Sequence, residues 1–263
     1  MTGNRRARIV VQERDRDFLR ELATHRIVDR EQAKCIAGFR STTRVNARLL
    51  ALHRAGLLRR YFIGTDCGGV KALYALSEKG ARLVDVPYRG LRRRQDEVLV
   101  ADFSVVHQLS INSVYCAWKC GSGSANRMSI ARWLTFTDSI SRKADLIPDA
   151  YAELVLPAEK VSTFLEVDLG HEGLAILKEK AKRYLDFAIS GDYERTFHEK
   201  RFRVLVLARS EQRARSIQKA VSVVTNKLFW FGTLANAMDG GVASSLWFRP
   251  GKEEPEPFLR PIL

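Results

Sequence analysis

Three carboxylates on neighbouring predicted strands are the residues of this chain most suited to chemistry. Asp149 lies at the start of a predicted strand over residues 146–156, and Glu166 and Asp168 end the next one, over residues 161–169. Because side chains alternate across a strand, Glu166 and Asp168 point to one face. Clustered carboxylates repel one another unless a cation compensates, and their hard oxygens suit Mg²⁺ or Mn²⁺. We therefore predict that the three are metal ligands; the alternative is three solvated strand ends.

A lysine on the following helix is the second candidate. The helix is predicted over residues 174–189, and at 100° per residue Lys180 falls within its apolar face, between Ile176 and Tyr184. A lysine on the core side of a helix needs an anionic partner, and the acidic site at the end of the preceding strand would supply one. Such a lysine could stabilise charge on a phosphate or orient an attacking water. The alternative is a side chain that snorkels to solvent.

The elements that would position these residues form an α/β domain with a mixed sheet. After residue 96 the apolar pattern predicts a helix, three strands, a helix, a strand, a helix and two short strands. Their predicted ranges are 98–118, 128–136, 146–156, 161–169, 174–189, 202–208, 211–225, 228–231 and 246–248.

The charge of the chain is concentrated in its first part. Residues 1–95 carry 22 Lys+Arg against 9 Asp+Glu, a net +13, whereas residues 96–263 carry 22 against 21. A single-sign imbalance of this size attracts phosphate backbones, so we expect the first part to bind double-stranded DNA. The alternative is a basic surface that only aids solubility.

The order of elements in the basic part predicts a winged helix-turn-helix domain. Helical patterns cover residues 13–25, 30–37 and 42–55, and a β-hairpin is predicted over residues 57–76. In that layout the third helix enters the major groove and the wing contacts the DNA backbone. A winged helix used only for protein contacts is the alternative. The predicted base contacts are Arg44, Asn46 and Arg48, and the predicted phosphate contacts are Arg40, Arg59, Arg60 and Lys71.

These patterns divide the chain into four parts: a winged-helix DNA-binding domain (1–84), a basic linker (85–97), an α/β domain with a mixed sheet (98–249) and a flexible tail (250–263). A hydrophobic content of 46% is enough for packed cores and excludes a disordered chain. No run of 18 apolar residues occurs, and the N-terminus has no apolar signal-peptide core, so we expect a cytoplasmic protein without a membrane segment.

Three short motifs, Pro148-Asp149, Glu166-x-Asp168 and Lys180-x-x-x-Tyr184, carry a resemblance. In their order and spacing the chain resembles the replication-relaxation family of bacterial plasmid and mobile-element proteins, which includes the MOBC class of conjugative relaxases. The resemblance covers roughly residues 14–208. It implies an α+β protein, with a winged helix followed by a mixed-sheet domain related to the PD-(D/E)xK restriction-endonuclease fold.

The resemblance also implies roles for individual residues. Asp149 and Glu166 match metal ligands, whereas Asp168 stands where the nuclease pattern has its lysine. Either Asp168 is a third ligand and Lys180 has taken over the role of the lysine, or the site no longer cuts DNA. His107 lies where the family tends to place a histidine, and it is either an acid or donor of the site or a packed core residue.

The function that we expect is metal-dependent nicking of DNA at a plasmid or mobile-element origin of transfer or replication. The attacking nucleophile is water or a tyrosine; for Tyr184 we expect packing instead. Single-stranded DNA at the nick, relaxosome or conjugation proteins and a second copy of the chain are further candidate partners. One alternative is a DNA-binding regulator or relaxosome accessory protein whose nuclease-like domain is inactive. Another is a double-strand endonuclease, which would need two active sites acting together.

Overall fold

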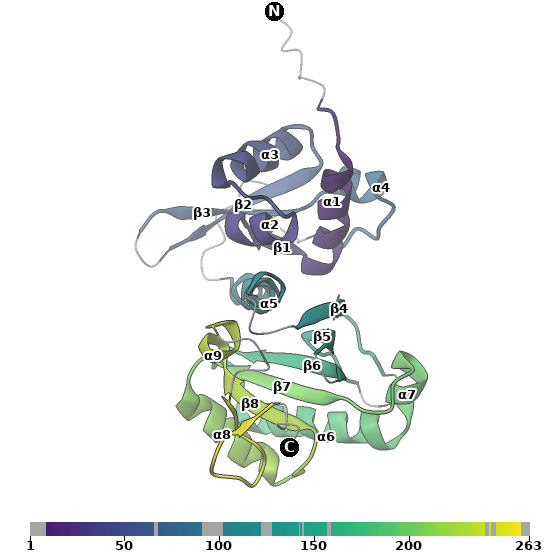
Figure 1. The fold of residues 1–263 in the computed structure, drawn as a ribbon, viewed down its shortest axis with the longest axis vertical. Helices are drawn as coiled ribbons and strands as arrows, with labels where there is room; N and C mark the ends of the chain where they lie inside the picture. The colour runs from purple at the N-terminus through teal and green to yellow at the C-terminus, as the bar shows by residue number, and fades with distance from the viewer. Residues whose placement is uncertain are drawn as a thin grey trace, which may run out of the picture. The chain divides into compact units, whose positions relative to one another are not determined.

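The computed structural model describes residues 9–65, 68–90, 102–121, 128–141, 143, 145–156, 159–239, 242 and 246–258. The chain is a mixed α+β protein that divides into two compact units, residues 1–116 and 117–263 (Figure 1). The first unit contains a three-stranded sheet and the second a five-stranded mixed sheet.

The first unit begins with three helices, α1 (Glu13–His25), α2 (Arg30–Ile36) and α3 (Thr42–Arg54). Side chains cap the N-termini of α2 and α3: Asp29 accepts the Gln32 N–H at 2.8 Å, and Ser41 accepts the Arg44 N–H. Gly56 follows α3 with φ +75°, a conformation that a side chain would strain. The strands β1 (Ile27–Asp29), β2 (Leu58–Gly64) and β3 (Val70–Leu76) form a sheet in the order β1-β3-β2, and α4 (Glu78–Leu83) follows.

Helix α5 (Phe103–Cys120) is divided between the two units, and residues up to Cys116 belong to the first. The fully buried Asn112 explains this attachment: its amide donates to the backbone oxygens of His25 at 3.0 Å and Ile27 at 2.7 Å. Helix α5 begins at Phe103 in the described residues. Residues 91–97 of the predicted linker and residues 98–101, the predicted start of this helix, lie outside the described residues.

The second unit is built on the sheet β4-β5-β6-β7-β8 (Figure 1). Neighbouring strands from β4 to β6 are antiparallel, and those from β6 to β8 are parallel. The strands are β4 (Ser129–Thr135), β5 (Ala150–Val155), β6 (Lys160–Asp168), β7 (Arg203–Ala208) and β8 (Phe229–Thr233).

Helices connect the parallel strands and cover one face of this sheet. Helices α6 (Leu174–Ile189) and α7 (Asp192–Phe197) lie between β6 and β7, and α8 (Glu211–Ser222) lies between β7 and β8. Figure 1 shows α6 and α8 on the same side of the sheet, where their apolar faces share one core with the strands. Helix α9 (Leu234–Asp239) follows β8.

The segment after residue 249, which we expected to be a flexible tail, is packed as far as Phe258. Strand β10 (Glu256–Pro257) pairs with β9 (Leu246–Trp247), and Phe258 is only 1% exposed. The Arg203 guanidinium lies 4.4 Å from the centre of the Phe258 ring and donates to its backbone oxygen at 3.0 Å. The pairing with β9 and the buried Phe258 ring thus anchor the described part of this segment.

Candidate functional site

The acidic residues predicted to be ligands meet where β5 begins and β6 ends. Ala150 is paired with Leu165 in this antiparallel pair, so Asp149, one residue before Ala150, and Glu166, one residue after Leu165, lie side by side at the same end of the two strands. One Asp149 oxygen accepts the Val167 N–H at 2.7 Å, which fixes the carboxylate beside β6. Asp149 is half-buried, and Glu166 is only 6% exposed.

Glu166 is held by two residues from successive turns of α6. The Lys180 ammonium forms an ion pair with one oxygen of Glu166, Oε2, and the Tyr184 hydroxyl donates to the other, Oε1. The expectation that Lys180 lies on the core side of the helix with an acidic partner is therefore confirmed. The hydrogen bond from Tyr184 was not predicted, although the spacing of four residues places it on the same helix face.

The environment shifts the ionisation of all three groups. Burial raises the pKa of Glu166 to about 7, an effect that Lys180 opposes and Asp149 reinforces. Burial lowers the pKa of Lys180, but the charges of Glu166 and Asp149 outweigh burial and raise it above its ordinary value. Burial, and then the charge of Glu166, raises the pKa of Tyr184 well above 10. Lys180 is therefore a fixed cation at neutral pH, and Tyr184 keeps its proton.

Asp168 points to the same face as Glu166 but has a different partner. Arg213 of α8 donates to both of its oxygens, from Nε at 2.7 Å and from Nη2 at 3.1 Å. The same guanidinium donates to the backbone oxygen of Glu172, so it joins the end of β6 to the loop before α6. Asp168 is thus engaged by an arginine that no local sequence pattern indicates.

The predicted trio is not brought together as one ligand set. Among the residues that the structure describes, no group of three or more His, Cys, Asp or Glu side chains could hold a metal ion. The donor chemistry of Asp149 and Glu166 still fits Mg²⁺ or Mn²⁺, because these cations need few protein carboxylates and keep several waters. Both oxygens of Asp168 are held by one guanidinium, whereas those of Glu166 have two separate partners, Tyr184 and Lys180, of which Lys180 lines the pocket. We therefore leave Asp168 out of the candidate ligand set.

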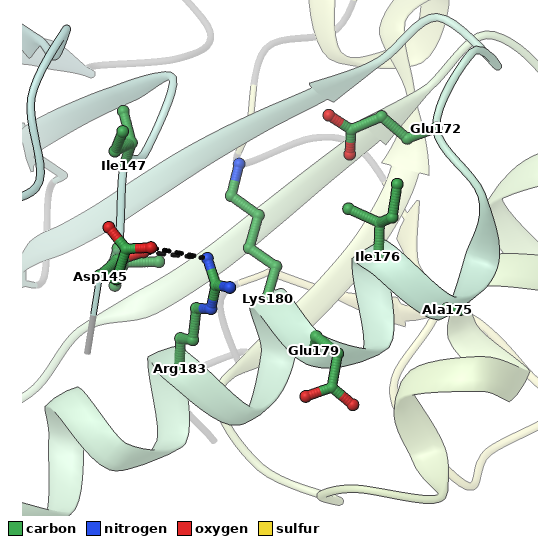
Figure 2. Close-up of a pocket in the computed structure, with 9 residues that line it drawn as sticks. Asp145, Ile147, Glu172, Ala175, Ile176, Glu179, Lys180 and Arg183 are labelled. Atoms are coloured by element: carbon green, nitrogen blue, oxygen red, sulfur yellow. Dashed lines mark hydrogen bonds and ion pairs between the residues drawn. The ribbon is translucent and has the colours of Figure 1, made fainter.

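A pocket of about 480 Å³ opens beside Lys180. Figure 2 shows the Lys180 side chain extending from α6 towards the strands, with Glu172 and Ile147 on either side of it and Glu179 pointing away. Arg183 donates to the backbone oxygen of Asp145 at 3.0 Å at the rim. The sequence analysis did not single out Glu172. The lining residues are Asp145, Leu146, Ile147, Glu172, Ala175, Ile176, Glu179, Lys180 and Arg183.

In the first unit, four of the predicted DNA-contacting residues are exposed: Arg40 before α3, Arg44 and Asn46 on it, and Lys71 on β3. On β2, the guanidiniums of Arg59 and Arg60 lie over the rings of Tyr61 and Phe62, at 5.3 and 5.0 Å from the ring centres. Lys71 of β3 is exposed and forms an ion pair with Asp29 at 2.7 Å.

Arg48, predicted to contact bases, has partners inside the first unit; its contact with DNA stays a prediction. Its Nε donates at 2.7 Å to Asp15 of α1, a carboxylate that is only 2% exposed, and its Nη2 donates at 2.8 Å to the backbone oxygen of Val10. Burial acts to raise the pKa of Asp15, but the hydrogen bonds from Arg48 and the Gln12 N–H outweigh burial and lower it. Arg48 therefore joins α3 to α1 and to the segment before it.

His107 is half-buried on α5, in the part of that helix that belongs to the first unit. It is therefore not among the residues that the second unit gathers around Glu166.

Comparison with known proteins gives one match. The family model described as replication-relaxation matches residues 19–199, which is more than half of the chain. No curated protein and no solved structure matches. In the described residues, no helix has the length and apolar character needed to cross a membrane. On the strength of the family match, the chain belongs to the replication-relaxation family.

Proposed function

We propose that this protein is a sequence-specific, metal-dependent DNA-nicking protein that acts at an origin of transfer or replication. Membership of the replication-relaxation family indicates a role in replication or mobilisation. The observation that carries the finer proposal is the position of Lys180, a buried cation paired with Glu166 beside Asp149 and lining an open pocket. Perturbed ionisable groups gathered at a pocket are typical of reaction sites.

The first unit would locate the DNA. Helices α1 to α3 followed by the β2–β3 hairpin fit the proposal of a winged helix-turn-helix, with α3 in the major groove. Arg44 and Asn46 are exposed on α3 and available to base edges, while Arg40 is available to phosphates. The net charge of +13 over residues 1–95 supports binding to the DNA backbone.

The second unit would cleave one strand, as a domain of the PD-(D/E)xK type. Asp149 and Glu166 would hold Mg²⁺ or Mn²⁺, which supplies an activated water and offsets charge on the phosphate. Lys180 would stabilise the negative charge that develops on the phosphoryl oxygens. Water adds to phosphorus, the P–O ester bond to the next sugar breaks, and the leaving oxygen takes up a proton.

Water is the nucleophile in this proposal. The Tyr184 hydroxyl is an unsuitable nucleophile, because the side chain is 1% exposed, the hydroxyl donates a hydrogen bond to Glu166, and its pKa is well above 10. A phenol that keeps its proton inside the core cannot attack a phosphate in the pocket.

A DNA-binding accessory protein is the second candidate function. It is favoured by the Arg213–Asp168 pair, which removes one of the three expected carboxylates from the candidate ligand set. A third candidate, a double-strand endonuclease with two copies of the chain acting together, is distinguished by a linear product.

Incubation with supercoiled plasmid carrying the native mobilisation region tests these functions. We expect open-circular product with Mg²⁺ or Mn²⁺ and none with EDTA. Asp149→Ala should abolish the product, whereas Asp138→Ala, which removes an exposed carboxylate of the same unit, should not. A mobility shift without cleavage, unchanged by metal or by Asp149→Ala, would favour the accessory protein.

A further inference from the structure

We infer that Tyr184 is a positioning residue of the candidate site, which fixes the Glu166 carboxylate so that a single oxygen is offered to cations. The inference rests on the proposed function and adds a residue that acts through Glu166. It is drawn from the two contacts of the Glu166 carboxylate: Tyr184 donates a hydrogen bond to Oε1, and Lys180 donates one to Oε2.

The position of the Tyr184 hydroxyl is set by its ring, which is packed among other aromatic side chains. The ring centres of Phe164, Phe202 and Phe229 lie 5.5, 6.3 and 5.8 Å from that of Tyr184. A tyrosine has few rotatable bonds, so a locked ring leaves the hydroxyl almost no freedom. The hydrogen bond to Oε1 therefore constrains the rotation of the Glu166 carboxylate.

Lys180 is a different kind of partner. Its ammonium lies at the end of four flexible methylenes, and the side chain is 21% exposed and lines the pocket. A divalent cation that binds Oε2 can displace this ammonium towards the pocket while Tyr184 keeps its hold on Oε1. The carboxylate would then keep its orientation when a metal ion replaces the lysine ammonium. Hydrogen bonds that orient a metal ligand in this way raise its affinity for the metal.

Another tyrosine of the same core provides a matched comparison. Tyr193 is 2% exposed and packs in the same aromatic cluster, but its hydroxyl donates to the backbone oxygen of Arg201 at 3.3 Å. Tyr193→Phe and Tyr184→Phe each remove one buried hydroxyl and keep the ring. The Tyr193 hydroxyl also has the side chains of Ser162 and Tyr151 as hydrogen-bond partners, and none of its partners is Glu166.

The test measures Mn²⁺ binding by calorimetry and the Mn²⁺ dependence of plasmid nicking. We expect Tyr184→Phe to weaken Mn²⁺ binding by about 10-fold, within the range for supporting residues, and Tyr193→Phe to leave it unchanged. Saturating Mn²⁺ should restore most of the nicking rate of Tyr184→Phe, because the change acts on affinity. Equal Mn²⁺ affinity for the two variants overturns the inference.

A double-variant cycle keeps the test independent of general packing effects. If Tyr184 acts through Glu166, then Tyr184→Phe should change Mn²⁺ affinity much less in a Glu166→Gln background than in the wild type. Additive losses would show that the hydroxyl acts elsewhere and would overturn the inference. If the wild type neither binds Mn²⁺ nor nicks, the proposed function fails and the inference fails with it. If the wild type nicks and the cycle is additive, the inference alone fails.

Discussion

Replacement of Arg48 with alanine tests whether this residue stabilises the fold of the first unit or contacts DNA. The substitution leaves Asp15 buried at 2% exposure without its cation and removes the hydrogen bond to the Val10 backbone oxygen. Removing one partner of a buried pair costs about 3–5 kcal/mol. The Arg48 side chain is 20% exposed, so water can reach the site, and we expect the lower end, about 3 kcal/mol. The first unit spans residues 1–116, and at about 2.1 cal/mol/K of unfolding entropy per residue this loss lowers Tm by about 12 °C.

The assay can report on the two units separately. All four tryptophans, Trp118, Trp133, Trp230 and Trp247, lie in the second unit. The loss in Arg48→Ala should therefore appear in the far-ultraviolet circular dichroism melt, with little change in tryptophan emission. Asp15 has a lowered pKa in the folded state, so the stability it contributes is lost as the pH falls through that pKa. The difference between variant and wild type should shrink at acidic pH.

Arg44→Ala is the matched control, since Arg44 is exposed on the same helix. It should change the free energy of unfolding by less than about 0.5 kcal/mol but weaken DNA binding, measured by fluorescence anisotropy across a salt series. If Arg48→Ala leaves Tm unchanged and weakens DNA binding as Arg44→Ala does, the assignment of Arg48 to the fold is wrong.

Two further substitutions test the ion pairs of the second unit. Lys180→Met leaves the buried Glu166 carboxylate without its cation. Burial raises the pKa of Glu166, so without Lys180 the carboxyl group of the folded protein holds its proton at acidic pH. At higher pH the group must ionise without a partner, so the loss of stability grows as the pH rises. Denaturant titrations should give a loss of about 3 kcal/mol at pH 8 and a smaller loss at pH 5. Arg213→Ala removes both hydrogen bonds to Asp168 and should cost about 3 kcal/mol. Glu211→Gln breaks an exposed ion pair and should cost less than about 1 kcal/mol.

Opposite outcomes would count against these assignments. Equal losses for Lys180→Met at both pH values would mean that Glu166 is not an ionised buried group at the higher pH. A loss for Arg213→Ala as small as that for Glu211→Gln would mean that the arginine does not hold the end of β6.

The longer elements were predictable because their signals are local. Helix α1 lies at its predicted bounds, residues 13–25, since one apolar stripe and its flanking residues define it. The shorter elements β1, α4, α7 and α9 were missed because three to six residues carry too little periodicity. Strand β5 begins at Ala150 instead of Leu146, after Pro148 and Asp149. Proline cannot donate to a sheet ladder, so the later start is consistent with its position.

The candidate site was predictable where the helical period alone carries the information. The helical period of α6 places Lys180 on the core side of the helix, where a lysine needs an acidic partner. That partner is Glu166. The partners of Asp168 and Arg48 were not predictable, because Arg213 is 45 residues from Asp168 and Asp15 is 33 residues from Arg48. Such ion pairs depend on how the helices and strands of a unit pack together. The spacing of residues along the sequence does not determine that packing.

Mapping the ends of the cleaved DNA tests the central claim most directly. Relaxed plasmid from a reaction with Mn²⁺ would be analysed by primer extension on both strands and by gel electrophoresis after protease treatment. We predict one break, at one position on one strand, with no protein attached to either end, and no break with Asp149→Ala. Intact strands that carry bound protein, or a break that persists in Asp149→Ala, would contradict nicking by this site.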